Sequence, residues 1–403
     1  MFRSDDQILS MLPGPCHLRE PVLRELAKQS EAYFQPYFDE QFVDPLLAKL
    51  KRVFQTSNIL FVTTGGGRVG LETAVASTIV PGDRVVVING GVFGEELAEL
   101  ATWLGGEVTL FDITPDQPLD VDALRAHVHR VRPAAVLMVH NETSTGSLLD
   151  VRAACAVAHE VDAVTIVDTV SSMGGIDCPT DDWGIDINVT ASQKCLEGPA
   201  GLAAMSVSDR AWRKIEAAPE PSRAWTRDLR FWKNRWLPEA AGGRNPHRGR
   251  WTPLALPSQL ICALSAGVDL VLAEGLQHRI TRHAIAGRAL EAGLAALGMT
   301  SIAGRNTSAL VKCVSLPGGL VSAPVIELML QRHRIRIASG FTRATCVRVS
   351  VIGATAEVGP IVATLLALED TLAQLGHQVA SPGCGARAAE DQLVAAMRTS
   401  STR

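Results

Sequence analysis

The 403-residue sequence lacks the features that mark several classes of protein. Its 38 basic residues do not outnumber its 42 acidic residues, so it has no basic surplus for nucleic-acid phosphates. No stretch stays apolar for the roughly 20 residues that a membrane-spanning helix needs. The first 15 residues are acidic and interrupted by proline, unlike a secretory leader. We therefore expect a cytoplasmic protein whose partners include neither nucleic acid nor a membrane.

The eight cysteines are scattered and contain no C-x-x-C pair. A disulfide framework or a thiolate metal site would need such short, recurring spacings. We predict neither of these, and we expect no metal site. With 47% hydrophobic and 20% charged residues, the composition is that of a globular chain long enough for two domains.

Short apolar runs rich in β-branched residues alternate with amphipathic helical stretches between residues 58 and 208. Strands separated by helices of this length form a mostly parallel sheet with helices on both faces. The sequence therefore predicts an α/β fold built on a seven-stranded sheet. The predicted strands are 58–63, 84–90, 107–113, 134–140, 163–168, 186–192 and 201–208.

The pattern changes after residue 208. Residues 219–253 are rich in Pro, Arg and Trp and are expected to be irregular. Helix returns at about 258–300, interrupted near Gly275, and a smaller α/β segment follows. We divide the chain into an N-terminal arm (1–20), a large domain (21–280), a small C-terminal domain (281–376), and a linker with a terminal helix (377–403).

Lys194 follows one predicted strand and Asp168 ends another, at the edge where open α/β sheets bind ligands. A lysine can form an imine with the carbonyl of pyridoxal phosphate (PLP), and a carboxylate beside the pyridine nitrogen keeps the ring protonated as an electron sink. Each residue alone has an ordinary explanation, since most lysines are solvated and an aspartate here can cap a helix. Their joint placement favours a PLP site.

The loop 64–68 contains three consecutive glycines and leads directly into a predicted helix. Their backbone N–H groups would lie at the positive end of the helix dipole, which suits a phosphate. Gly65, Gly67 and Gly70 also match the G-x-G-x-x-G pattern of dinucleotide-binding folds. That pattern expects an acid at the end of the next strand, where this chain has Asn89. A dinucleotide site stays open as an alternative.

Three further residues have chemistry that a PLP site uses. Phe93 could cover the cofactor ring or pack into the core, and Thr143 belongs to a polar run after an apolar strand. Arg348 lies inside an apolar strand, where burying an arginine is costly without an anion, unless the strand lies at an edge. A substrate carboxylate would be such an anion.

Together these segments resemble the class V aminotransferase family of fold-type I PLP enzymes, above all its alanine/serine–glyoxylate and ureidoglycine–glyoxylate branches. Single motifs are weak, but their order and spacing over most of the chain are specific. The resemblance implies a large PLP-binding domain, a smaller C-terminal α/β domain, and a homodimer with the active site at the subunit boundary. The motifs are LPGP, FQTSN, TGGGRVGLE, NGGVFGEE, HNETSTG, VDTVSSMGG, SQKCLEGPAG and VRVSVIGATAE.

The resemblance also implies a role for each matching residue. Lys194 would hold PLP as an internal aldimine, and Asp168 would pair with the pyridine nitrogen. Phe93 and Val170 would cover the two faces of the ring, and Thr143 would hydrogen-bond near its hydroxyl group. The phosphate would be surrounded by Gly66, Gly67, Arg68 and Gln193.

For the substrate, the resemblance implies that Arg348 binds the α-carboxylate, with the backbone around Gly14 nearby. Tyr33 is a further candidate contact, and it stands where the ureidoglycine branch has a glutamine, which argues against ureidoglycine. Arg68 stands where the pyridoxamine-using relatives have an acid, which argues against pyridoxamine. The segment Trp251–Pro257 would reach the phosphate bound in the neighbouring subunit.

We therefore expect an aminotransferase that moves an amino group from an amino acid or primary amine to glyoxylate or pyruvate, with the freed Lys194 amine as proton carrier. A lyase or desulfurase of the same fold is one alternative. It would need a mobile cysteine or another elimination device, and Cys195 is expected to point away from the site in its strand-like context. A NAD-dependent oxidoreductase is the other alternative.

The donor is addressed by one further feature, the segment from Ser222 to Trp251, which carries eight Arg or Lys residues against two acids. A solvated loop or a subunit contact would explain this composition. A cationic lining of the active-site mouth would instead favour a donor with an anionic end, such as an acidic amino acid or an aminophosphonate.

Overall fold

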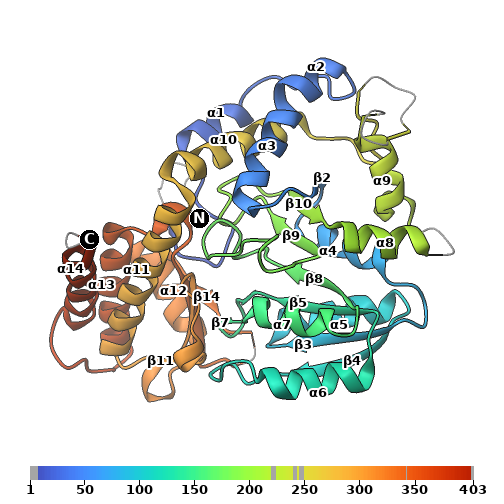
Figure 1. Ribbon diagram of the computed structural model, residues 1–403. Coiled ribbons are helices and arrows are strands. Elements are labelled where there is room, and N and C mark those ends of the chain that lie inside the picture. The colour runs from blue at the N-terminus through green and yellow to red at the C-terminus, as the bar shows by residue number, and fades with distance from the viewer. Residues whose placement is uncertain (1–7, 219–223, 239–242, 245–248, 342, 401–403) are drawn as a thin grey trace.

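The computed structural model describes residues 8–218, 224–238, 243–244, 249–341 and 343–400. A seven-stranded sheet forms the centre of its larger part (Figure 1), and each predicted strand matches an observed one to within one residue at either end. Six strands run in one direction, and β10 is antiparallel to both of its neighbours, which confirms the mostly parallel sheet. The spatial order is β2 (Ile59–Thr64), β10 (Leu202–Val207), β9 (Ile187–Ala191), β8 (Val164–Asp168), β5 (Ala135–Val139), β3 (Arg84–Asn89) and β4 (Glu107–Asp112).

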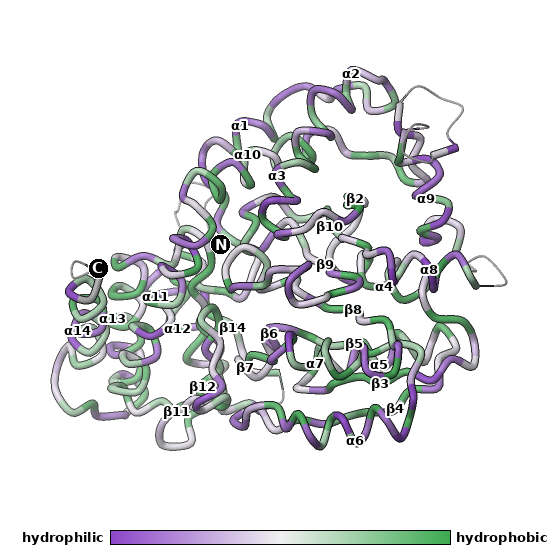
Figure 2. Tube along the Cα trace, viewed as in Figure 1, coloured by the Kyte–Doolittle hydropathy of each residue, from purple (hydrophilic) through white to green (hydrophobic). Residues whose placement is uncertain are grey.

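Helices cover both faces of this sheet, so its central strands are buried along their whole length. The outer helix α6 (Val121–Val131) instead alternates hydrophilic and hydrophobic residues (Figure 2). Its residues Leu124 and Val128 are buried. The other helices of this part are α1 (Glu20–Leu26), α2 (Pro36–Phe38), a π-helix (Asp39–Val43), α3 (Asp44–Phe54), α4 (Gly67–Thr78), α5 (Val92–Trp103), α7 (Val151–His159), α8 (Asp209–Ala217) and α10 (Ser258–Glu274).

The prediction that residues 219–253 are irregular was wrong, because helix α9 (Leu229–Trp236) lies within them. The side chain of Asp228 caps this helix by accepting a hydrogen bond from the backbone N–H of Arg230 (2.8 Å). Trp232 and Trp236, one helical turn apart, are buried against each other with their ring centroids 5.9 Å apart. The helix is therefore stabilised by tertiary packing of its tryptophans more than by local propensity.

The smaller part begins after a bend at Gly275, where α10 meets α11 (Leu276–Ala296) at 85°. A second hydrophobic core starts on α11 at Ala286, so the predicted domain boundary at residue 280 falls inside a helix, and the division remains a prediction. No single described helix is long and apolar enough to cross a membrane, although the bent pair α10–α11 together meets that test of length and composition. The sheet and helices of this part are β11 (Thr300–Ser301), β12 (Val311–Ser315), β15 (Cys346–Ser350), β14 (Ala338–Ser339), α12 (Ser322–His333), α13 (Val358–Gln374) and α14 (Cys384–Ser400).

The N-terminal segment connects the two parts of the molecule. Its strand β1 (Leu9–Ser10) pairs with β13 (Ile335–Arg336) of the smaller part. A few residues later, the N–H of Cys16 donates to the carbonyl of Gln193 in the larger part (2.8 Å). The chain between these two attachments therefore passes directly beside Lys194.

Candidate active site

Loops that follow β2, β3, β8 and β9 line one cavity of about 670 Å³. They converge because strands that run in the same direction end at the same edge of a sheet. The cavity wall includes seven of the predicted cofactor residues: Gly67, Arg68, Phe93, Asp168, Val170, Gln193 and Lys194. It is completed by Phe341 and by side chains of α4 and α5: Leu71, Glu72, Glu96, Leu97, Glu99, Leu100 and Trp103.

Asp168 is the last residue of β8, and only 7% of its surface is exposed. Its Oδ1 accepts a hydrogen bond from the N–H of Val170 (2.7 Å). Burial raises the pKa of Asp168 to about 7, against the effect of that hydrogen bond and with a further contribution from nearby Glu142. Within the described part of the chain, no ion pair neutralises this carboxylate. A protonated pyridine nitrogen is the kind of cation that the position lacks.

Lys194 lies in the turn after β9, and burial lowers the pKa of its amine. Its Nζ donates to the carbonyl of Pro13 (2.5 Å). Gly14 is predicted to lie near the substrate, and a Cβ built on it would stand 2.5 Å from Cδ of Lys194. A side chain at position 14 would therefore displace the lysine, so the two positions are adjacent, and the contact of Gly14 with a substrate remains a prediction.

The glycine loop forms a cradle at the N-terminus of α4. A Cβ built on Gly67 would stand 2.4 Å from Cγ2 of Val170, and one on Gly66 would stand 3.8 Å from Nε2 of Gln193. The side-chain oxygen of Gln193 is buried and accepts no hydrogen bond from the described residues. N–H groups at a helix N-terminus, with the donor Nε2 of Gln193 beside them, fit a phosphate group, so the cavity fits PLP at both of its ends.

The Arg68 side chain does not point into this cradle. Its guanidinium donates twice to the carboxylate of Glu96 (2.6 and 2.9 Å), and Cζ lies 5.9 Å from the centre of the Phe93 ring. Any contact between residue 68 and a phosphate in this conformation belongs to the backbone of the α4 N-terminus.

Glu142, which was not singled out from the sequence, fixes the loop that carries Phe93. It lies in the hairpin of β6 (Asn141–Glu142) and β7 (Ser147–Leu148), and its carboxylate accepts the N–H groups of Phe93 (3.1 Å) and Gly94 (3.2 Å). Burial raises its pKa, and Ser144 opposes that rise by donating through its N–H and hydroxyl. A carboxylate at the N-terminus of α5 also suits the helix dipole. Its position inside the polar run HNETSTG was the available signal.

Arg348 is buried in the middle of β15, with β12 on one side and β14 on the other, which excludes the edge-strand explanation. Its Nε donates to the carbonyl of Ser339 (2.8 Å) and its Nη1 to the carbonyl of Thr143 (3.3 Å). Its Cζ lies 4.1 Å from the ring centre of Phe341, another residue not foreseen from the sequence. Burial lowers the pKa of Arg348, and no described carboxylate forms an ion pair with it.

Tyr33 is not brought to this cavity within one chain. Its ring packs against Phe34, with 4.3 Å between the ring centroids, and Phe34 stacks on Trp251 at 4.7 Å. The segment Trp251–Pro257 runs beside β2, where Thr64 donates to the carbonyl of Ala255 (2.7 Å). Its predicted reach into a second subunit remains a prediction.

The Arg- and Trp-rich segment 222–251 is largely committed to the fold. Arg227 pairs with Glu72 (3.1 Å), and Lys233 pairs with Glu216 (2.6 Å). Arg250 pairs with Asp44 (2.6 Å). The described residues of this segment do not line the cavity, so an anionic donor finds no support in a single chain. The parts at 222–223, 239–242 and 245–248 lie outside the described residues.

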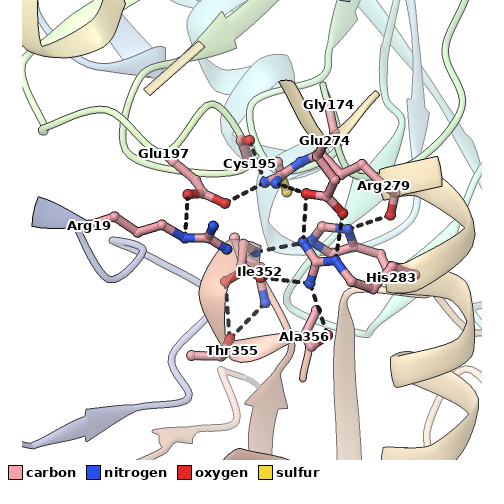
Figure 3. Close-up of polar contacts among 12 residues, drawn as sticks. Arg19, Gly174, Cys195, Glu197, Glu274, Arg279, His283, Ile352, Thr355 and Ala356 are labelled. Carbon is pink, nitrogen blue, oxygen red and sulfur yellow. Dashed lines mark hydrogen bonds and ion pairs between the residues drawn. The ribbon is translucent and has the colours of Figure 1, made fainter. Parts of the chain in front are cut away.

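A second charged cluster contacts Cys195 and Glu197, which follow Lys194 in the chain (Figure 3). We call it the Arg279 cluster. Arg279 is fully buried and donates to the carbonyls of Gly174 (2.9 Å) and Cys195 (3.0 Å) and to the carboxylate of Glu197 (2.8 Å). Its members are Arg19, Glu197, Glu274, Arg279, Arg282 and His283. The cluster therefore joins the loops that follow β8 and β9.

The same cluster reaches the loop after β15. Arg282 donates to the carbonyls of Gly353 (3.0 Å) and Ala356 (2.9 Å), and Nε2 of His283 accepts the N–H of Gly353 (3.0 Å). Burial lowers the pKa of His283 to about 3, so the ring is neutral and can accept that bond. The Lys194 turn and the strand of Arg348 are thus held by one set of residues.

Comparison with known proteins identifies the family of this chain. The model of the aminotransferase class-V family matches residues 44–357. An uncharacterised aminotransferase of Methanocaldococcus jannaschii is 32% identical over 93% of this chain and 95% of its own length. The pyridoxamine–pyruvate transaminase of Mesorhizobium japonicum is 29% identical, over 93% of this chain and 94% of its own.

A solved structure agrees with these sequence matches. The crystal structure of ureidoglycine–glyoxylate aminotransferase from Bacillus subtilis superimposes with a TM-score of 0.89 at 29% identity, covering 97% of this chain and 99% of that one. A dinucleotide-dependent oxidoreductase is therefore excluded, and the G-x-G-x-x-G match is coincidental. The chain belongs to the class V aminotransferases, PLP-dependent enzymes of fold type I.

Proposed function

We propose that the protein transfers an amino group from an amino acid or primary amine to a small 2-oxo acid, glyoxylate or pyruvate. The observation that carries this proposal is Arg348, a buried cation without a carboxylate partner in the described structure, beside the cavity that contains Lys194. A buried guanidinium of this kind gains most from a bidentate carboxylate, which every 2-oxo acid and α-amino acid carries.

The chain's own groups would divide the work as follows. PLP, when bound, accepts the electron pair of the bond broken at the substrate's α-carbon. Lys194 holds the cofactor and, once freed, moves the proton at that carbon, a task helped by the lowered pKa of its amine. Asp168 would hold the ring nitrogen, and Phe93 and Val170 would enclose the ring. The N-terminus of α4 and Gln193 would receive the phosphate, and Thr143 would hydrogen-bond near the ring hydroxyl.

We also propose a homodimer that completes the site. The outer wall of the cavity mixes leucines and glutamates of α4 and α5 and ends at Trp103, a large apolar side chain that is 86% exposed in the single chain. A second copy covering this wall would remove that surface from water. Tyr33 and the segment Trp251–Pro257 would then serve the neighbouring site.

The desulfurase alternative requires a reactive thiolate. Cys195 is fully buried, and burial raises its pKa to about 12. Burial likewise raises the pKa of Cys16 to about 12. Neither thiol next to the Lys194 turn has the low pKa of a nucleophile, which favours amino transfer over desulfuration.

The test follows the cofactor's visible absorption band in two half-reactions. An amino donor should bleach the band, and glyoxylate or pyruvate should restore it. Lys194→Ala should abolish both steps, whereas Lys312→Met, which removes another buried lysine outside the cavity, should retain them. Release of ammonia or sulfide without consumption of the 2-oxo acid would identify a lyase or desulfurase instead.

A further inference from the structure

Phe341 lies in the loop after β14, and its ring forms part of the wall of the cavity that contains Lys194. About half of its surface is exposed (51%), although most large apolar side chains of this chain are buried. The core therefore does not require this ring. An aromatic ring at the opening of a cavity is placed to contact a ligand that enters the cavity.

The contacts of Phe341 connect two parts of the proposed site. Its ring centre lies 4.1 Å from Cζ of Arg348, within the range of a cation–π interaction. The same ring also meets Phe93 edge to face, at 5.7 Å between centroids and 90° between planes. Phe341 thus spans the space between the residue that would bind the substrate carboxylate and the residue that would cover the cofactor.

A substrate has to lie across this same space. If Arg348 holds its carboxylate and its reacting carbon lies beside Lys194, the group attached to that carbon points toward the wall that includes Phe341. A hydrogen or methyl group leaves the ring in place. A larger group would have to displace the ring from both Arg348 and Phe93.

We propose that Phe341 is the residue that determines specificity for small 2-oxo acids. It stacks on Arg348, which orients the guanidinium for a carboxylate, and its bulk excludes larger substrate side chains. This inference rests on the proposed function, because it concerns the carboxylate that Arg348 would bind.

Three variants separate the two effects. Phe341→Tyr keeps the ring, Phe341→Leu keeps apolar bulk without the ring, and Phe341→Ala removes both. Loss of the stacking should raise KM for glyoxylate by about 2–30-fold in the Leu and Ala variants and leave it nearly unchanged in the Tyr variant. Removal of bulk should raise the kcat/KM ratio of phenylpyruvate to glyoxylate by about 10–200-fold in the Ala variant alone.

Binding is measured separately from turnover. Pyruvate and phenylpyruvate are titrated by calorimetry into the enzyme in its PLP form, which has no amino group to give. Phe341→Ala should weaken pyruvate binding and strengthen phenylpyruvate binding. Phe231→Ala is the matched control, because that ring carries a similar cation–π contact with Arg235 (4.5 Å) away from the cavity, and it should change neither value.

Unchanged selectivity in Phe341→Ala, in an enzyme whose wild type uses glyoxylate, would overturn the inference and leave the proposed function standing. A wild type that neither uses nor binds any 2-oxo acid would overturn the proposed function itself. Melting temperatures of all variants show whether a change reflects the site or the fold, and a half-exposed ring predicts little change in them.

Discussion

Two buried arginines, Arg279 and Arg348, have opposite surroundings. Arg279 contacts the carboxylates of Glu197 (2.8 Å) and Glu274 (2.9 Å) in addition to two backbone carbonyls. Arg348 donates to backbone carbonyls and stacks on Phe341, with no ion pair in the described structure. The first cation is neutralised within the chain, whereas the second still lacks a counter-charge.

The same contrast extends to the regions around them. Every acid of the Arg279 cluster pairs with an arginine, and Arg282 and Arg279 lower the pKa of Glu274 to about 2 although burial opposes this. In the cavity, neither Asp168 nor Lys194 forms an ion pair within the described residues. Burial of charge alone therefore does not identify a site, because structural clusters bury charge as well. A deficit of partners identifies the place where a charged ligand is expected.

The largest effect on stability is expected from a substitution in the Arg279 cluster, where the buried charges are paired. Arg279→Met should lower the free energy of unfolding by about 3–5 kcal/mol, because the buried Glu197 would lose its buried cation and keep only the partly exposed Arg19. Arg348→Met, which leaves no carboxylate unpaired, should cost about 1–2 kcal/mol for its lost hydrogen bonds. Urea unfolding of the PLP-bound enzyme, followed by circular dichroism, measures both. Equal losses would show that the two environments do not differ in the way described.

A smaller effect, of a few kcal/mol at most, is expected at Asp168, since each unit of pKa is about 1.4 kcal/mol. A pKa raised to about 7 means that the folded, PLP-free protein binds a proton more tightly than the unfolded chain. The stability that this proton gives is present below about pH 4 and is lost as the pH rises through 7. In Asp168→Asn the side chain does not ionise, so the variant does not show this pH-dependent loss of stability.

Melting temperatures of the PLP-free proteins between pH 4 and 8 check the sign. Wild type and Asp168→Asn should agree near pH 4, and the variant should become increasingly more stable as the pH rises to about 7, with no further change above that. With PLP bound the order should reverse, because the ionised carboxylate then has a cation to pair with. A constant difference across this range would show that Asp168 is ionised throughout.

Substitutions at Arg348 and Arg279 should also differ in their effect on enzyme kinetics. Arg348→Lys keeps a charge but loses the planar fork that matches a carboxylate. We therefore expect kcat/KM for glyoxylate and pyruvate to fall by about 10–160-fold, the equivalent of a charged hydrogen bond of about 1.5–3 kcal/mol. Arg279→Lys, assayed at a temperature where it is folded, should retain KM more closely. Unchanged kinetics in Arg348→Lys would make that arginine structural.

A feature of the fold or of the candidate site could be predicted from the sequence only where its pattern lies within one contiguous segment. The strands, and the position of Lys194 and Asp168 at one edge of the sheet, were predictable, because apolar runs and the polar residues that end them are contiguous in the sequence. Thr143 and Arg348 are 205 positions apart, and their contact appears only when the hairpin of β6 and β7 meets β15. Phe341 could not be recognised, since an aromatic residue in a loop carries no periodic signal.

Packing decided the features that local chemistry left open. Helix α9 was missed because Trp232 and Trp236 look like interface residues until Phe61 and Trp212 are seen beside them. The cations of the same segment suggested an anionic substrate until their acidic partners, such as Glu72 and Glu216, were located. Sequence shows the charge of a side chain but not whether it is already paired.

The smallest effects are expected at Arg68, because this arginine is paired with a carboxylate and is also exposed to solvent. Its side chain is 75% exposed and its partner Glu96 is 36% exposed, so water already solvates both charges. Arg68→Ala should change stability by no more than about 1 kcal/mol. If the backbone of the α4 N-terminus receives the phosphate, PLP affinity in titrations of the cofactor-free enzyme should change by less than about threefold, since only a screened surface charge is lost.

The variant Glu96→Gln is the control, because it releases Arg68 from its ion pair without removing the guanidinium. A tenfold loss of PLP affinity in Arg68→Ala, with a gain in Glu96→Gln, would mean that the guanidinium turns inward to the phosphate and that its pairing with Glu96 competes with the cofactor.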